Sequence, residues 1–176
     1  IAEAVEQIAR VTGRQFFDDE GGLITPQASN RRGVDAFAAT VSAGKPLQIV
    51  LSGLVPDLSV ASARRAAAGT YSRVAAVLGG GEGGSLSDEE RVRAIRQAEP
   101  DVVLLAGGVD GGAERPVLDA AKAATLACAM MEREDRPTII YAGNAQLRRA
   151  VTEIVADEAQ LRVVDNVRPT LDDEYV

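Results

Sequence analysis

Residues 101–117 read DVVLLAGGVDGGAERPV and combine three signals of secondary structure. The continuous apolar run from Val102 to Ala106 is typical of a strand that is buried on both faces of a sheet. A glycine-rich turn follows the run, and Pro116 then favours the first turn of a helix. The order strand, turn, helix is that of one unit of a parallel α/β sheet.

The same unit recurs along the chain from residue 47 onward, because short apolar runs alternate with amphipathic segments. Strands are predicted at residues 47–51, 74–78, 102–106, 138–141 and 161–164, and helices at 59–68, 87–98, 116–132 and 145–156. This alternation predicts an α/β fold, a three-layer sandwich with a mainly parallel five-stranded sheet of the Rossmann or flavodoxin-like type.

Two of the predicted helices have informative local patterns. Ser87-Asp-Glu-Glu90 is a capping box, which marks the start of a helix. In the segment 116–132, apolar residues return every three or four positions and should face the sheet. These residues are Val117, Ala121, Ala124, Cys128 and Met131.

The first part of the chain gives weaker signals. Apolar residues from Ile1 to Val11 follow a helical period, and the acidic and glycine residues 18–22 lie between two short apolar pairs, as in a hairpin. Residues 34–41 fit a helix or a strand equally well. We therefore predict an N-terminal helix with an irregular or hairpin segment over residues 1–45, and a parallel α/β domain over residues 46–176. The chain starts inside a helical pattern without an initiator methionine, so we expect an internal fragment of a longer protein.

The composition excludes several classes of function. Nineteen basic and 26 acidic residues give a net charge of −7, which argues against binding to nucleic-acid phosphates. No stretch approaches the roughly 20 apolar residues of a membrane span. The chain has no histidine and one cysteine, Cys128, so Ser-His-Asp catalysis, Cys-His catalysis, imidazole-bound metals and disulfides are excluded. We predict no catalytic residue, no metal site and a cytoplasmic location.

The candidate ligand-binding residues all follow predicted strands. In open α/β sheets, ligands bind beyond the carboxyl ends of the strands, at the point where the strand order reverses. If the strand order is 2-1-3-4-5, this point brings Gly53 and Asp110 to one crevice. The full candidate set is Gly53, Gly107, Gly108, Asp110, Gly111, Gly112, Gly143 and Asn144.

The glycines also have simpler interpretations. The turn is not a dinucleotide fingerprint, because Val109 stands where the second glycine of GxGxxG is required, and no phosphate loop of the GxxxxGK[ST] kind exists in the chain. For the turn at 107–112, plain turn geometry with positive φ is favoured over a ligand site, whereas at Gly143-Asn144 a turn that caps the next helix and a ligand contact are equally favoured. A second glycine-rich segment, residues 79–84, is acidic at its end and is interpreted as a surface loop rather than a phosphate cradle.

Several of these stretches resemble the glutamate mutase L family, which is unrelated to the DNA mismatch-repair protein that shares the short name MutL. The similarity covers about residues 40–171, and its most specific parts are the Ala-Gly-Gly-Val-Asp-Gly-Gly turn at 106–112 and the Ala-Gly-Asn turn at 142–144. The other similar stretches are residues 42–44, 47–56, 62–69, 102–105, 140–141 and 165–169.

The resemblance implies an accessory or reactivating chaperone of adenosylcobalamin-dependent glutamate mutase, within the actin-like ATPase superfamily. It implies the mutase subunits as partners, and ATP as a cofactor of the whole protein. The family's Asp-Ile-Gly-Ser-Thr type motif is missing here, so we predict a non-catalytic accessory domain without a cofactor of its own. The residues alone leave two alternatives. One is a small-ligand-binding or enzymatic Rossmann-like domain that uses the crevice, with Asp110 as general base. The other is a purely structural domain.

Overall fold

The computed structural model describes residues 2–28, 30–38, 44–79 and 86–175. Contacts divide the chain into two compact units, Ile1–Gly44 and Lys45–Val176, and each unit is described by itself. Among the described helices, none has the length and apolar character needed to cross a membrane.

The first unit contains one helix and a short hairpin. Helix α1 spans Ala2–Thr12 and is followed by Gly13, which has a positive φ of 62°. Phe17 and Leu23 form an isolated antiparallel bridge, as the hairpin prediction requires. Residues 34–38 form neither helix nor strand, and the rest of the ambiguous segment at 34–41 lies outside the described residues.

The second unit is built on a five-stranded sheet in the order β2-β1-β3-β4-β5. All four strand pairs are parallel, so the sheet is entirely parallel where the sequence predicted a mainly parallel one. The strands are β1 (Leu47–Ser52), β2 (Ser72–Leu78), β3 (Val102–Leu105), β4 (Thr138–Tyr141) and β5 (Leu161–Val163). This order is the condition on which the predicted crevice rests, and its switch point lies between β1 and β3.

The crossovers between the strands are helical, as predicted. The α-helices are α2 (Ala61–Ala68), α3 (Asp88–Ala98), α4 (Arg115–Ala129) and α5 (Arg148–Val155), and the short helical turns are η1 (Pro56–Val60), η2 (Arg133–Asp135) and η3 (Ala145–Leu147). The capping box at Ser87 is present in full. Helix α4 ends three residues before its predicted end, so Met131 is only half-buried, whereas Cys128 belongs to the core as predicted.

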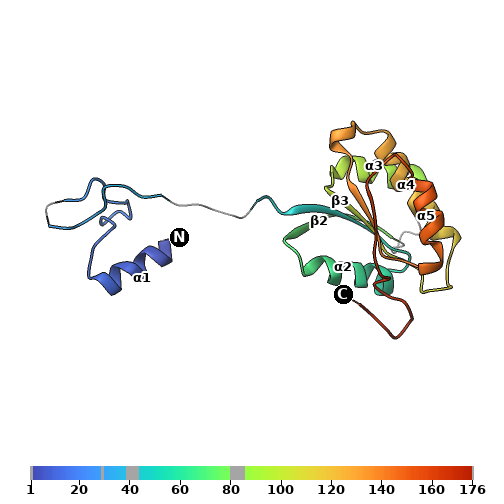
Figure 1. Ribbon diagram of the computed structural model, residues 1–176, viewed down its shortest axis with the longest axis horizontal. Helices are drawn as coiled ribbons and strands as arrows, with labels where there is room; N and C mark the ends of the chain where they lie inside the picture. Colours follow the sequence, from blue (N-terminus) through green and yellow to red (C-terminus); the bar gives the residue numbers. More distant parts are fainter. Residues whose placement is uncertain (1, 29, 39–43, 80–85, 176) are drawn as a thin grey trace. The chain divides into compact units, whose positions relative to one another are not determined.

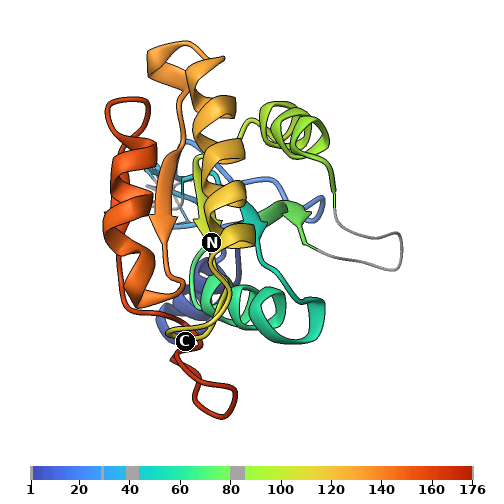
Figure 2. The ribbon, with the colours of Figure 1, turned by 90° about the vertical axis from the view of Figure 1, so that its right-hand side faces the viewer.

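The sheet lies between two layers of helices, which confirms the three-layer prediction. Helix α2 covers one face, and α3, α4 and α5 cover the other (Figure 1). These three helices lie side by side in the order of the strands beneath them (Figure 2). Successive residues of a strand point to opposite faces, so Ile49 and Leu51 pack toward α2 while Val50 packs toward the other layer. Alanines such as Ala63 and Ala67 form much of the contact surface of α2.

Candidate functional site

Three loops interlock beyond the carboxyl ends of β3, β4 and β5. They comprise residues 106–112, 142–145 and 165–169, and we call this group the loop clasp. Asp110 Oδ1 accepts hydrogen bonds of 2.8 Å from the backbone N–H of Ala145 and from Nδ2 of Asn166. The backbone N–H of Asp110 donates to the carbonyl of Pro169 at 2.9 Å. One residue therefore joins all three loops.

Asn144 is the buried centre of the clasp, with no exposed side-chain surface. Its Oδ1 accepts from the backbone N–H groups of Gly111 and Gln146 at 3.1 and 3.0 Å, which caps the turn η3. The Tyr141 hydroxyl donates to the Asn144 carbonyl at 2.8 Å. Burial raises the pKa of Tyr141 to about 12, and the nearby Asp110 charge adds to the rise, so this hydroxyl stays a proton donor at neutral pH.

The glycines of the clasp are required by close packing and backbone geometry. A Cβ on Gly143 would lie 2.6 Å from the carbonyl oxygen of Gly107, closer than any real Cβ contact. Gly108 and Gly111 both have a φ of 73°, which side chains rarely allow. A Cβ on Gly112 would lie 2.8 Å from Cγ2 of Val109. The glycine-rich sequence thus lets loop backbones approach each other directly.

The structure brings most of the predicted site residues together. Residues 107–112, 143 and 144 all belong to the clasp. Gly53 instead packs against η1, where an added Cβ would lie 2.7 Å from Cγ2 of Val60. Within the described part of the chain, no hydrogen bond joins Gly53 to Asp110. Most of the other glycine-rich segment, residues 79–84, lies outside the described residues.

A pocket of about 180 Å³ opens at the switch point, between the ends of β1 and β3. Its wall is mainly aliphatic, and the polar groups in it already have partners. Ser59 Oγ accepts from the backbone N–H groups of Leu54 and Val55, and Asn166 belongs to the clasp. The lining residues are Leu54, Val55, Leu58, Ser59, Gly107, Gly108, Val109, Ala113, Asn166, Val167, Arg168 and Leu171.

The sequence predicts a crevice at this switch point, and its candidates Gly107 and Gly108 line the pocket, but it does not predict the wall that comes from the segment after β5. This segment, residues 165–175, returns to α2 and is held there by charged side chains. Arg168 Nε donates to Ser62 Oγ at 2.9 Å, and Arg65 Nε donates to both carboxylate oxygens of Glu174 at 3.0 Å. The hydrogen bonds from Arg65 lower the pKa of Glu174. The signal in the sequence for an apolar wall was the pair Leu54-Val55, which follows β1 after Gly53.

The family model for the MutL protein family matches residues 1–176, which is the whole chain. The chain belongs to the MutL protein family. Protein MutL of Clostridium tetanomorphum is 36% identical to this family member over 135 residues, which are 76% of this chain and 27% of the relative. This MutL family chain therefore spans about a quarter of the length of the curated relative that it matches. No solved structure matches it significantly.

The chemistry available to this MutL family member is limited. Burial raises the pKa of the Cys128 thiol to about 11, so the thiolate needed for nucleophilic attack is scarce at neutral pH. Among the described residues, no cluster of three or more cysteine, aspartate or glutamate side chains is arranged to hold a metal ion. Asp110 already accepts two hydrogen bonds within the clasp. The arrangement is therefore suited to binding, through loop backbones and an apolar pocket.

Proposed function

We propose that this chain is a non-catalytic, binding part of an accessory protein that assists an adenosylcobalamin-dependent glutamate mutase. The loop clasp is the observation that carries this proposal. The turns at 106–112 and 142–144 contain the most specific residues of the resemblance to the glutamate mutase L family. Residues of the same turns make the hydrogen bonds that hold the three loops of the clasp together. Turns that resemble those of this family and that pack in this way provide a binding surface of defined shape and no reactive group.

The chemistry of the site supports a binding role over a catalytic one. Asp110 has a structural task in the loop clasp, because its Oδ1 accepts hydrogen bonds from Ala145 and Asn166 and so holds two loops in place. The buried Cys128 thiol, with its raised pKa, is unsuited to act as a nucleophile.

The test is association of the complete protein with its mutase. Tagged protein is mixed with purified glutamate mutase subunits, with and without ATP and with and without cobalamin, and retention is quantified. We expect specific retention in at least one of these states, and weaker retention for Asp110→Ala, because the clasp surface loosens. Arg149→Glu on α5 is the control, since its side chain is 91% exposed and lies outside the clasp. Absence of retention in every state would rule the proposal out.

A second candidate function is small-ligand binding, and the pocket at the switch point favours it. Ligands of open α/β sheets bind at this position. Apolar cavities of about 150 Å³ bind molecules of the size of benzene. The pocket, at about 180 Å³, has aliphatic walls whose polar neighbours are already paired, so it suits a compact apolar group.

Thermal shift measurements with benzene and indole test the second candidate. Binding to the folded state raises the melting temperature by mass action, and the shift grows as the ligand concentration exceeds the dissociation constant. Val109→Phe fills the pocket and should abolish the shift, whereas Val164→Phe, at an exposed position outside the pocket, should retain it. If neither probe shifts the melting temperature of the wild-type chain, this candidate is wrong.

A further inference from the structure

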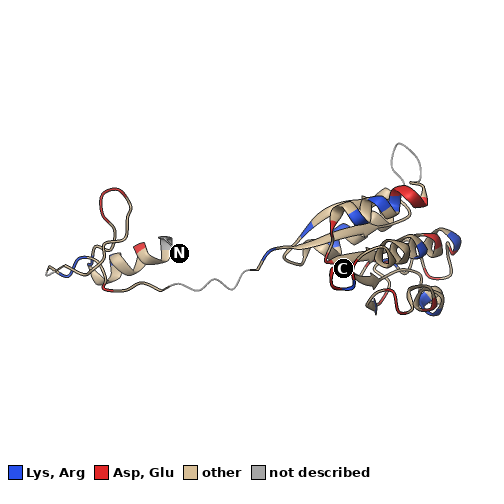
Figure 3. Cartoon of the chain, turned by 90° about the horizontal axis from the view of Figure 1, so that it is seen from above, with Lys and Arg blue, Asp and Glu red and all other residues tan. Residues whose placement is uncertain are grey.

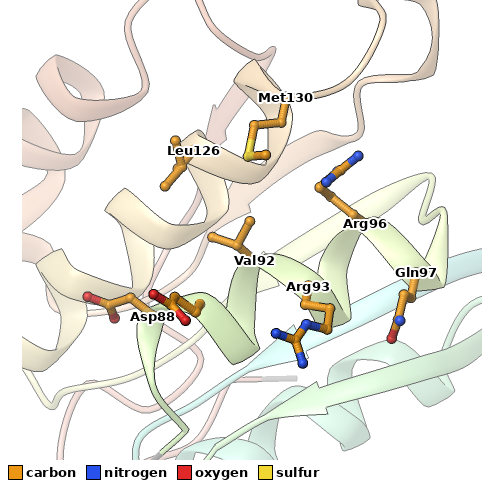
Figure 4. Close-up of a pocket in the computed structure, with 8 residues that line it drawn as sticks. Asp88, Val92, Arg93, Arg96, Gln97, Leu126 and Met130 are labelled. Carbon is orange, nitrogen blue, oxygen red and sulfur yellow. The ribbon is translucent and has the colours of Figure 1, made fainter.

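A groove of about 610 Å³ runs between α3 and α4, on the far side of these helices from the sheet (Figure 4). It is distinct from the loop clasp and from the pocket at the switch point. Its lining residues are Asp88, Glu89, Val92, Arg93, Arg96, Gln97, Leu126 and Met130.

Apolar side chains form most of the middle of the groove, beside Arg93 of α3. Leu126 and Met130 project from the end of α4, and each keeps 53% of its surface exposed. They are four residues apart and so lie on one side of the helix. Val92 of α3 is buried and lies on the side of α3 that faces them (Figure 4). Large apolar side chains gathered in a groove with a charged border are typical of protein interfaces.

The two ends of the groove have opposite charge. Asp88, Val92 and Arg96 are spaced by four residues and therefore form one line along α3, in which the outer two are separated by about 12 Å of helix rise. The acidic first turn of α3 and the arginines that follow it are visible in Figure 3. Val92 lies midway between a carboxylate and a guanidinium.

We propose that a second copy of this chain occupies the groove, related to the first by a two-fold axis that passes beside Val92. In a two-fold interface, if residue i contacts residue j of the partner, j also contacts i. With the axis at Val92, Asp88 of each copy faces Arg96 of the other copy. The same rotation reverses the direction of α4, so Leu126 of each copy also faces Met130 of the other.

The charge pattern favours a second copy over a different partner. A uniformly acidic segment would meet Asp88 and Glu89, and a uniformly basic segment would meet Arg96, so each would face repulsion at one end. A copy of the same groove turned by 180° meets opposite charge at both ends. This self-association is independent of the accessory role proposed above.

Sedimentation velocity of the full chain over a range of concentrations tests this inference. We expect a reversible monomer–dimer equilibrium that weakens as salt is added. Asp88→Arg and Arg96→Glu should each weaken dimerisation by about tenfold or more, because one substitution turns two attractive contacts into two repulsive ones. The control, Arg149→Glu, makes the same charge change as Arg96→Glu on a distant helix and should dimerise as the wild type does.

Mixing the two variants gives the decisive result. In the mixed pair, the new positive charge at position 88 faces the new negative charge at position 96, and the two original residues still face each other. The mixture should therefore dimerise although neither variant does so alone. Combining both substitutions in one chain should also restore self-association.

Other outcomes overturn the inference. Asp88 also pairs with Arg91 on its own helix at 3.1 Å, so thermal melts must show that each variant is folded. If Asp88→Arg fails to fold, Arg96→Glu alone still decides the case, because it should weaken dimerisation while Arg149→Glu does not. A wild-type chain that stays monomeric at submillimolar concentration and low salt contradicts the proposal. So does a mixture that stays monomeric, or a groove whose variants affect only retention of glutamate mutase.

Discussion

The carboxylate of Asp110 accepts a hydrogen bond of 2.8 Å from the side-chain amide of Asn166, which lies 56 positions later in the chain. The two residues follow β3 and β5, the strands on either side of β4. The bond therefore passes over the end of β4, where Ala145 donates to the same carboxylate oxygen. A single side chain thus fixes the edge of the sheet on which the candidate site is built.

Asp110→Ala should lower the free energy of unfolding by about 1–2 kcal/mol, because two donors lose their acceptor at a partly exposed site. Asp110→Asn retains an oxygen acceptor of the same shape and should cost less. Urea unfolding monitored by circular dichroism measures both variants. Equal stability of the wild type and Asp110→Ala would show that water replaces these hydrogen bonds and that the clasp does not depend on them.

Gly143→Ala should be more disruptive than its single methyl group suggests. The added Cβ would lie 2.6 Å from the backbone oxygen of Gly107, so one of two loops must move. Overpacking of this kind typically costs about 1–3 kcal/mol. Gly69→Ala is the matched control, since its φ is −74° and the nearest atom to an added Cβ lies at 3.7 Å. The control should be neutral or slightly stabilising in the same urea titration, and a similar loss in both variants would contradict the packing argument.

The sheet and its helices could be predicted because their signals are local. The run Val102–Ala106 is buried on both faces, and the capping box at Ser87 specifies the start of α3 through bonds within four residues. The strand order is different, because it depends on contacts between distant segments; the sequence offered 2-1-3-4-5 only as one arrangement known from parallel α/β sheets. Helix α4, by contrast, was predicted to extend to residue 132, because Met130 and Met131 continue the apolar pattern past the last helical residue, Ala129.

The sequence placed the glycine turns at the carboxyl ends of β3 and β4, but it did not specify the contacts that they make there. Asn144 Oδ1 accepts a hydrogen bond from the backbone of Gly111, next to Asp110. The role of Asn166 and the apolar pocket depend on a segment after β5 that has no regular secondary structure. Its return to α2 rests on Arg65 and Glu174, which are 109 positions apart, and no local pattern specifies such a pair.

Cys128 should react with thiol reagents only when the protein unfolds. Burial raises its pKa to about 11, so at pH 8 only about one thiol in a thousand is ionised, and the side chain is also enclosed. The rate of reaction with Ellman's reagent should follow the unfolded fraction as urea is added. The urea-unfolded chain is the control for full reactivity. Rapid labelling of the folded chain would show that α4 opens locally.

The contact between Glu174 and Arg65 should make the attachment of residues 165–175 depend on pH. The hydrogen bonds from Arg65 lower the pKa of Glu174 below its ordinary value of 4.5. A lowered carboxyl pKa stabilises the attached state fully above the ordinary value, and this contribution is lost as the pH falls through the lower folded value. The segment should therefore loosen only under acidic conditions.

Hydrogen exchange of the Tyr175 amide reports on this attachment, because that N–H donates to the carbonyl of Val167 at 2.9 Å. After correction for the intrinsic effect of pH on exchange, its protection should fall below pH 4.5 in the wild type. Glu174→Gln keeps the shape of the side chain but cannot ionise, so its protection should be lower at neutral pH and should not change across this range. If protection falls equally in both proteins, the acid sensitivity does not come from Glu174, and the segment's attachment does not depend on its contact with Arg65.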